Sequence, residues 1–307
     1  MAPTALNLLL SLAVYIRITN GNLSTPPRGW NSWISYKGCI NETQVIQNAE
    51  AVVKYLKPYG YEYIVIDGGW SSGTNPSNGE SKQFIDEYGR PQPAEWKYPH
   101  SANGQGFKWL SSQIHSMGLK FGVWVGRGIT QTALTANTPI YGTDNKIHAK
   151  DIYSSSTKCP WDSDLFSVDP AKNGSQQFIN SLYDQFSQWG VDFIKNDCTF
   201  GGDYYPDQID LINNAMDHIK QTMNGYEFTY SLSPGNINDG PSNLPDVSHT
   251  TGQVNMYRIT MDTWDQYESN ILKHFNVTQF WQAGGFIGNA GRDGGKSYPD
   301  LDMLPLG

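Results

Sequence analysis

The feature that most constrains the fold of this chain is a regular alternation of short β-branched runs with longer segments of helical periodicity. This order is typical of parallel α/β proteins, in which a helix follows each strand and returns the chain to the same end of the sheet. We expect seven strands, at residues 29–33, 61–67, 119–125, 191–197, 226–231, 254–260 and 279–285. We expect helices at residues 42–56, 106–117, 175–189, 206–223 and 262–275.

The length of 307 residues is close to that of one (β/α)8 barrel, which has about 250 residues or more. A doubly wound open sheet is the alternative, but residues 29–39 lack the glycine fingerprint of that fold. Seven strands are one fewer than a closed barrel needs, and the sequence ends in an extended tail, P-D-L-D-M-L-P-L-G. The predicted fold class is therefore α/β, a (β/α)8 TIM barrel truncated before its eighth strand. A long polar loop at residues 68–104 is expected to have a functional role, and a second extended excursion is expected at residues 127–170.

The charge balance excludes some classes of partner. Charged residues make up only 16% of the chain and the net charge is −8, with no basic cluster. Nucleic acids and anionic membrane surfaces are therefore poor partners, and a neutral or cationic ligand fits better. The 31 glycines and 10 tryptophans favour a rigid, loop-rich enzyme of extracellular type.

The N-terminus contains a leucine-rich apolar run at residues 6–16, followed by polar residues. This pattern predicts a signal peptide at residues 1–21 and a mature chain at 22–307, although a buried N-terminal helix or strand is the alternative. Four N-x-S/T sequons, at Asn22, Asn41, Asn173 and Asn276, favour a secreted glycoprotein. The expected location is secreted or lysosomal/vacuolar, with no membrane association after cleavage of the signal peptide.

Neither the cysteines nor the histidines predict a metal site. The three cysteines lack paired C-x-x-C spacing, and the six histidines form no H-x-x-x-H or H-x-H pair. We therefore expect no metal and no cofactor. In an oxidising compartment, one disulfide and one remaining thiol are the simplest outcome for three cysteines.

Three acids, Asp67, Asp197 and Asp262, lie at or just beyond the ends of predicted strands, where a barrel would bring them to one mouth. Two carboxylates beside aromatic residues are what hydrolysis of a sugar acetal requires, one to attack or stabilise the sugar carbon and one to protonate the leaving oxygen. The alternative is that these acids cap helices. Lys195 shares a side of its strand with Asp197 and would keep that acid ionised, unless it forms a purely structural ion pair.

Seven motifs, in order along the chain, resemble glycoside hydrolase family 27, the α-galactosidase and α-N-acetylgalactosaminidase family, and in particular its plant-like branch. They are G-W-N-S-W (29–33), Y-I-V-I-D (63–67), G-L-K-F-G-V-W (118–124), W-G-V-D-F-I-K-N-D-C (189–198), Y-S-L-S-P-G (230–235), Y-R-I-T-M-D (257–262) and P-D-L-D-M-L (299–304). Because family members continue beyond this point, the resemblance implies that the end of the barrel and a C-terminal β-sandwich domain are missing.

The resemblance also implies roles for individual residues. A retaining mechanism would use Asp197 as the nucleophile and Asp262 as the acid/base. The other expected positions are Lys195, Arg258 and Asp67 on sugar hydroxyls, Trp33 and Trp124 in the aromatic wall, and a disulfide between Cys159 and Cys198. The expected substrates are carbohydrates: galactosides, galacto-oligosaccharides or glycoconjugates.

Departures from the family pattern leave the sugar open. Gly68 stands where many members have a second acid, Gly69 stands where they have a cysteine, and Cys39 thereby loses its usual partner. Ser233 is small and would leave room near C2 of the sugar. An α-galactoside, an α-N-acetylgalactosaminide and a β-L-arabinopyranoside all remain candidates, as does a catalytically silent sugar-binding relative. A loosened P-loop at 290–297 is a further alternative, and the sequence does not set the oligomeric state.

Overall fold

The computed structural model describes residues 23–200, 204–234, 247–264, 271–283, 285 and 291–304. The predicted signal peptide at residues 1–21 lies outside this part of the chain. Within the described part, no helix is both long and apolar enough to cross a membrane.

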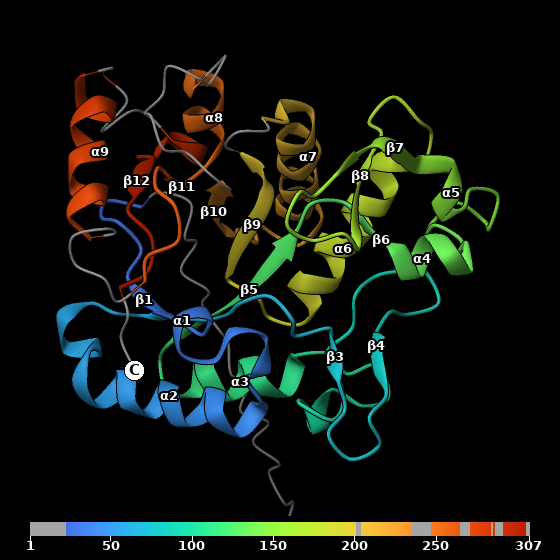
Figure 1. Ribbon diagram of the computed structural model, residues 1–307, viewed down its shortest axis with the longest axis horizontal. Coiled ribbons are helices and arrows are strands. Elements are labelled where there is room, and N and C mark those ends of the chain that lie inside the picture. Colours follow the sequence, from blue (N-terminus) through green and yellow to red (C-terminus); the bar gives the residue numbers. More distant parts are fainter. Residues whose placement is uncertain are drawn as a thin grey trace, which may run out of the picture.

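The molecule is built around one parallel sheet with the strand order β1-β2-β5-β9-β10-β11-β12 (Figure 1). Its strands are β1 (Gly29–Asn31), β2 (Tyr63–Ile66), β5 (Lys120–Gly126), β9 (Phe193–Phe200), β10 (Thr229–Pro234), β11 (Met256–Arg258) and β12 (Tyr298–Asp300). The sheet is curled, because Tyr63, Val65, Phe193 and Met256 pack together from β2, β9 and β11, although none of these three strands neighbours another. The described residues thus form an α/β fold whose parallel sheet curves as part of a barrel; an eighth strand is not among them.

A helix lies in each connection between successive strands of the main sheet, and the helices cover the outside of the curled sheet (Figure 1). These helices are α2 (Glu42–Tyr55), α3 (Lys108–Ser116), α6 (Ser175–Gln188), α7 (Pro206–Thr222), α8 (Val247–Gln253) and α9 (Leu272–Ala283). A short helix, α1 (Trp33–Tyr36), directly follows β1. The start of α2 is fixed by a capping box, in which the Asn41 side chain accepts from the Gln44 backbone N–H and the Gln44 side chain accepts in return from the Asn41 N–H.

Two excursions from the barrel pattern follow the C-terminal ends of β2 and β5. The first contains a hairpin of β3 (Ser72–Thr74) and β4 (Ser81–Gln83). The second contains α4 (Gln131–Ala136) and α5 (Ala149–Ile152) with a small antiparallel sheet in the order β6-β8-β7. The strands of that small sheet are β6 (Ile129–Thr130), β7 (Tyr153–Lys158) and β8 (Leu165–Val168).

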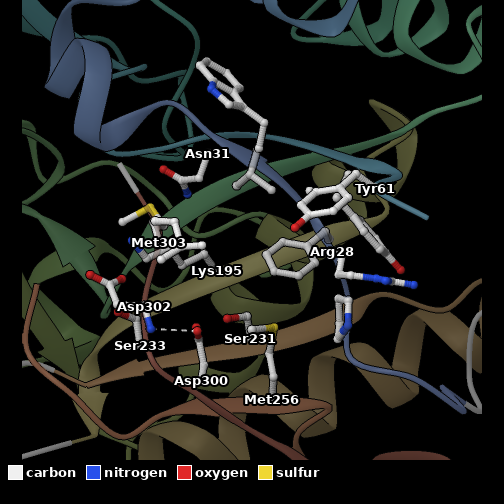
Figure 2. A pocket seen from close by; sticks show the side chains of 17 residues that line it. Arg28, Asn31, Tyr61, Lys195, Ser231, Ser233, Met256, Asp300, Asp302 and Met303 are labelled. Atoms are coloured by element: carbon white, nitrogen blue, oxygen red, sulfur yellow. Dashed lines mark hydrogen bonds between the residues drawn. The ribbon is translucent and has the colours of Figure 1, made fainter. Parts of the chain in front are cut away.

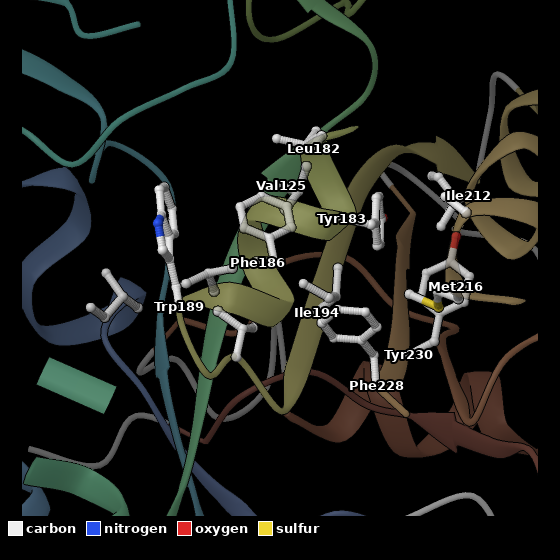
Figure 3. Close-up of a cluster of buried hydrophobic side chains, with 14 of the residues drawn as sticks. Val125, Leu182, Tyr183, Phe186, Trp189, Ile194, Ile212, Met216, Phe228 and Tyr230 are labelled. Atoms are coloured by element: carbon white, nitrogen blue, oxygen red, sulfur yellow. The ribbon is translucent and has the colours of Figure 1, made fainter. Parts of the chain in front are cut away.

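The hydrophobic core lies between the sheet and its helices. Figure 3 shows Val125, Ile194 and Tyr230 of the sheet facing Phe186 of α6 and Met216 of α7. Strands that are covered on both faces are apolar throughout, as in β2, where all four residues are buried. Polar side chains that follow such strands are therefore carried on a rigid support.

The seventh strand is not where the sequence predicted it. Residues 279–283 belong to α9, whose buried side chains His274, Val277 and Trp281 recur at intervals of three and four residues, as on one face of a helix. The prediction of a strand at 279–285 is therefore wrong. Of the helix expected at 262–275, residues 262–264 are not helical and α9 begins at Leu272, while residues 265–270 lie outside the described part of the chain. The seventh strand is β12, which overlaps the start of the P-D-L-D-M-L motif. Because the segment before it leads into this strand and not into a helix, the P-loop alternative is contradicted.

Candidate active site

The C-terminal ends of the strands surround a cavity of about 700 Å³. Every predicted catalytic and sugar-binding residue except Ser233 lines it: Trp33, Asp67, Trp124, Lys195, Asp197, Arg258 and Asp262. They lie within β5, β9 and β11 or follow the C-terminal ends of β1, β2 and β11. The parallel sheet thus gathers side chains that are almost 230 residues apart in the sequence.

Asp197 is held by two N–H donors. The indole Nε1 of Trp124 donates to its Oδ2 at 3.0 Å, and the backbone N of Cys198 donates to its Oδ1 at 2.8 Å. Burial raises the pKa of Asp197 above its usual value, while the charges of Lys195 and Arg258 and the two N–H donors act in the opposite direction. Cys198 itself has φ of 68°, in the left-handed region that a side chain rarely adopts, and the pairing of β9 with β10 shifts register directly after Asp197.

At the inner end of the cavity, Lys195 is paired with Asp67. Its Nζ lies 2.7 Å from Asp67 Oδ2, an oxygen that also accepts from Asn31 Nδ2 at 2.8 Å. Burial disfavours the Lys195 ammonium, but the negative charges of Asp67, Asp197 and Asp302 outweigh it and raise the pKa of Lys195 above its usual value. The pair places a cation and a carboxylate where sugar hydroxyls could bind.

At the outer end, Arg258 is paired with Asp262. The guanidinium Nη2 lies 2.8 Å from Asp262 Oδ1, and Nη1 lies 3.5 Å from Asp302 Oδ1. Burial disfavours the Arg258 cation, yet the surrounding carboxylates raise its pKa above the usual value. The Asp262 side chain is 41% exposed and that of Asp67 only 4%, so Asp262 lies at the mouth and Asp67 at the closed end.

Ser233 does not line the cavity that holds the acids. It is buried, accepts a hydrogen bond from Arg258 Nη1 at 3.3 Å and faces a second cavity of about 220 Å³, shown in Figure 2. Lys195 lines both cavities and lies between them. Ser233 is therefore placed to orient Arg258, and its expected position beside C2 of a sugar stays a prediction.

The structure contains the disulfide between Cys159 and Cys198, which joins the β7–β8 excursion to the end of β9. Cys39 is exposed and has no disulfide partner among the described residues. No group of three or more His, Cys, Asp or Glu side chains in the described ranges is arranged to hold a metal ion.

Sequence reasoning did not identify several residues of the site. Asn31 lies within the first motif, and Asp300 and Asp302 lie within the last. Asp302 Oδ2 accepts from the Thr263 backbone N at 2.7 Å, next to Asp262. Burial, and then the neighbouring charge of Asp302, raise the pKa of Asp300 to about 6. The rule that selected the other acids, a position at a strand end, would have found both once β12 was recognised.

Comparison with known proteins identifies relatives of this chain. Residues 25–171 match the family model described as alpha galactosidase A. The crystal structure of a family 27 β-L-arabinopyranosidase from Geobacillus stearothermophilus, in complex with arabinose, superposes with a TM-score of 0.80 at 37% identity, over 92% of this chain and 62% of that one.

The curated relatives of the chain are also glycosidases. Alpha-galactosidase 3 of Arabidopsis thaliana is 25% identical over 95% of this chain and 51% of its own length. Human alpha-N-acetylgalactosaminidase is 30% identical over 39% of this chain and 28% of its own. The chain thus spans about half the length of the plant relative and less of the human one. These similarities support the assignment of the chain to glycoside hydrolase family 27.

Proposed function

We propose that this protein is a retaining exo-glycosidase that hydrolyses terminal α-galactosyl-type residues. The observation that carries the proposal is that Asp197 and Asp262 line one cavity, with the buried Asp67–Lys195 pair at its closed end. A cavity closed at one end admits only the terminal sugar of a chain. Both acids are present, which favours catalysis over a silent sugar-binding role.

The mechanism proposed for this site has two displacements. An oxygen of Asp197 forms a bond to the anomeric carbon while the bond to the leaving oxygen breaks, and Asp262 gives its proton to that oxygen. Asp262 then takes a proton from water, whose oxygen attacks the same carbon and releases Asp197. The N–H groups of Trp124 and Cys198 hold the Asp197 carboxylate in place through both steps.

The ion pairs of the site would respond to substrate. Asp67 and Lys195 can exchange part of their mutual contact for the hydroxyls of a bound sugar. Arg258 contacts one oxygen of Asp262, and Asp262 must donate its proton from an oxygen that is free of this contact. Contact between Arg258 and the sugar would weaken the ion pair and so allow Asp262 to protonate the leaving group.

A second candidate function within the same mechanism is β-L-arabinopyranosidase. Gly68 supplies no carboxylate where many members have a second acid, and a Cβ there would lie 3.5 Å from the Trp124 ring. A pentopyranose of galactose-like ring stereochemistry lacks C6 and needs one ligand fewer. The 37% identity to an arabinopyranosidase also favours this substrate.

The substrate is tested by assaying the p-nitrophenyl α-galactoside, α-N-acetylgalactosaminide and β-L-arabinopyranoside in parallel. Turnover of the first supports the main proposal, and preferential turnover of the third supports the second candidate. Absence of turnover on all three would contradict the enzymatic function. We further propose a secreted or lysosomal/vacuolar location, where a Cys159–Cys198 disulfide is stable.

The assignment of the nucleophile gives a separate prediction. Asp197→Ala should lower kcat by about 10⁴-fold or more, because no covalent intermediate can form. Added azide should restore turnover and give a glycosyl azide of inverted configuration. Asp144→Ala, at an exposed position that does not line the cavity, serves as the control and should keep wild-type rates. Appearance of the inverted azide product with Asp262→Ala instead would exchange the two roles.

A further inference from the structure

Two tryptophans of the described chain are strongly exposed, and both line the cavity that holds the acids. Trp161 is 51% exposed and Trp264 is 37% exposed, and Met261, at 38%, lines the same wall. Trp30, Trp70, Trp189 and Trp281, in contrast, are buried in the core. Large apolar side chains gathered at one exposed place indicate a binding surface.

The position of these side chains relative to the acid decides what they would contact. Met261 and Trp264 lie on the same segment as Asp262, at the open end of the cavity. The group that receives a proton from Asp262 must lie beside it, and this group is the leaving portion of the substrate. The sugar that reacts with Asp197 lies deeper, against Asp67 and Lys195.

The size of the cavity also exceeds what a single sugar requires. Its volume of about 700 Å³ falls within the range of about 300–1,000 Å³ for pockets that enclose larger ligands. The outer part of the cavity can therefore take a second ring beyond the one that reacts.

Both tryptophans are held by distant parts of the chain. Lys37 Nζ lies 5.7 Å from the centre of the Trp264 ring, in a cation–π contact, and Lys37 has φ of 50° at the end of α1. Trp161 is two residues from Cys159, whose disulfide ties this segment to the end of β9. Held aromatic faces bind a ring with less loss of conformational entropy than free ones do.

We propose that Trp161, Met261 and Trp264 form a leaving-group subsite that stacks on the pyranose ring of the sugar next to the scissile bond. This inference rests on the proposed function. One face of a pyranose presents C–H groups, which carry partial positive charge and pack on the negative face of an indole ring. The enzyme would therefore favour oligosaccharides over glycosides with small leaving groups.

The test compares two substrates that share the reacting sugar. An α-galactosyl disaccharide carries a ring in the leaving group, and α-galactosyl fluoride carries none. If the wild-type enzyme prefers arabinopyranosides, a β-L-arabinopyranosyl disaccharide and β-L-arabinopyranosyl fluoride replace these two substrates. Trp264→Ala and Trp161→Ala should each lower kcat/KM for the disaccharide by about tenfold, roughly the effect of losing one aromatic stacking contact. Turnover of the fluoride should change less than twofold, which also shows that the variants are folded.

Two matched variants sharpen the result. Trp264→Phe keeps an aromatic face and should retain most of the disaccharide activity. Tyr59→Ala removes an exposed aromatic side chain on the surface and should leave kcat/KM for both substrates unchanged. An equal loss of kcat/KM for both substrates, or no loss for either, would overturn the proposed subsite while leaving the proposed function intact. If the wild-type enzyme turns over neither substrate pair, the proposed function itself fails.

Discussion

The pKa of Asp197 depends on a balance between burial and stabilising contacts. Burial favours the neutral acid, whereas Lys195, Arg258, the Trp124 indole and the Cys198 N–H favour the carboxylate. In the proposed mechanism only the carboxylate attacks. The acid limb of the pH–rate profile should therefore report the ionisation of Asp197, at a pH above the usual range of an aspartate.

The Trp124 indole allows this balance to be tested. Trp124→Phe removes a hydrogen bond that stabilises the carboxylate, so the pKa of Asp197 should rise further and the acid limb of kcat/KM should move to higher pH. A hydrogen bond to a charged group contributes about 1.5–3 kcal/mol, so a displacement of about one pH unit is expected. Profiles of kcat/KM against pH for the two proteins measure it. A lower kcat/KM with an unmoved acid limb would show that Trp124 acts only as a wall of the pocket.

Sequence reasoning selected Asp67, Asp197 and Asp262, which line one cavity, but not Asn31 or Asp302, which contact the site from β1 and from beyond β12. Asp67 and Asp197 could be selected because each lies at or just beyond the end of an apolar strand, where parallel sheets carry polar side chains. The contact of Asn31 with Asp67 and that of Asp302 with Thr263 join residues 36 and 39 positions apart. Such contacts depend on how the strands are ordered and curved, which local patterns do not encode.

At the scale of elements, the strands with the longest apolar runs were predicted well. The expectations at 61–67, 119–125 and 191–197 correspond to β2, β5 and β9, which lie side by side in the sheet. The failure came at 279–285, where a short apolar run fits a strand and a buried helix face equally well. The true seventh strand, β12, has only three residues and contains a proline, so its sequence carries no strand pattern.

The disulfide links two elements of the site and gives a prediction at this scale. Replacing Cys159 and Cys198 together by alanine should lower the free energy of unfolding by about 2–4 kcal/mol, because the 39-residue loop is no longer closed in the unfolded chain. The segment that bears Trp161 should also loosen, which would raise KM for a disaccharide. Denaturant unfolding and steady-state kinetics measure the two effects.

The third cysteine provides the matched control. Cys39→Ala removes an exposed thiol outside the disulfide and should leave both the unfolding free energy and KM unchanged. If the double variant unfolds at the same denaturant concentration as the wild type, the disulfide does not stabilise the fold.

At the scale of the whole molecule, the inside of the curled sheet carries opposing charges. Lys195 and Arg258 lie among the acids of β2, β9 and β12, and Figure 2 shows Asp300 and Asp302 close together beside Ser233. The Asp302 backbone N–H donates to Asp300 Oδ1 at 2.8 Å, and Asp302 has φ of 74°. The fold therefore holds two carboxylates side by side, and burial together with the charge of Asp302 makes it costly in free energy to keep Asp300 ionised.

This cost should make global stability depend on pH. The pKa of Asp300 is about 6 in the folded protein, above the 3.8 usual for an aspartate, so the folded state binds more protons than the unfolded chain between these values. The contribution of Asp300 to the free energy of unfolding is thus most favourable below about pH 4, falls as the pH rises to 6, and stays low above it. Asp300→Asn keeps the oxygen that accepts from Asp302 but carries no charge. The variant should therefore not lose this part of the free energy of unfolding as the pH rises to 6.

The expected result is a stabilisation of Asp300→Asn by roughly 1–2 kcal/mol at pH 7.5 and almost none at pH 4, measured by urea unfolding at both pH values. The range is set below the full value of the shift because Asp300 is only partly buried. Asp144→Asn, at an exposed position, should change stability at neither pH. A variant that is destabilised at pH 7.5 would show that the Asp300 charge is needed by Arg258 and Lys195, and that the buried cations, not the paired carboxylates, dominate the electrostatics of this interior.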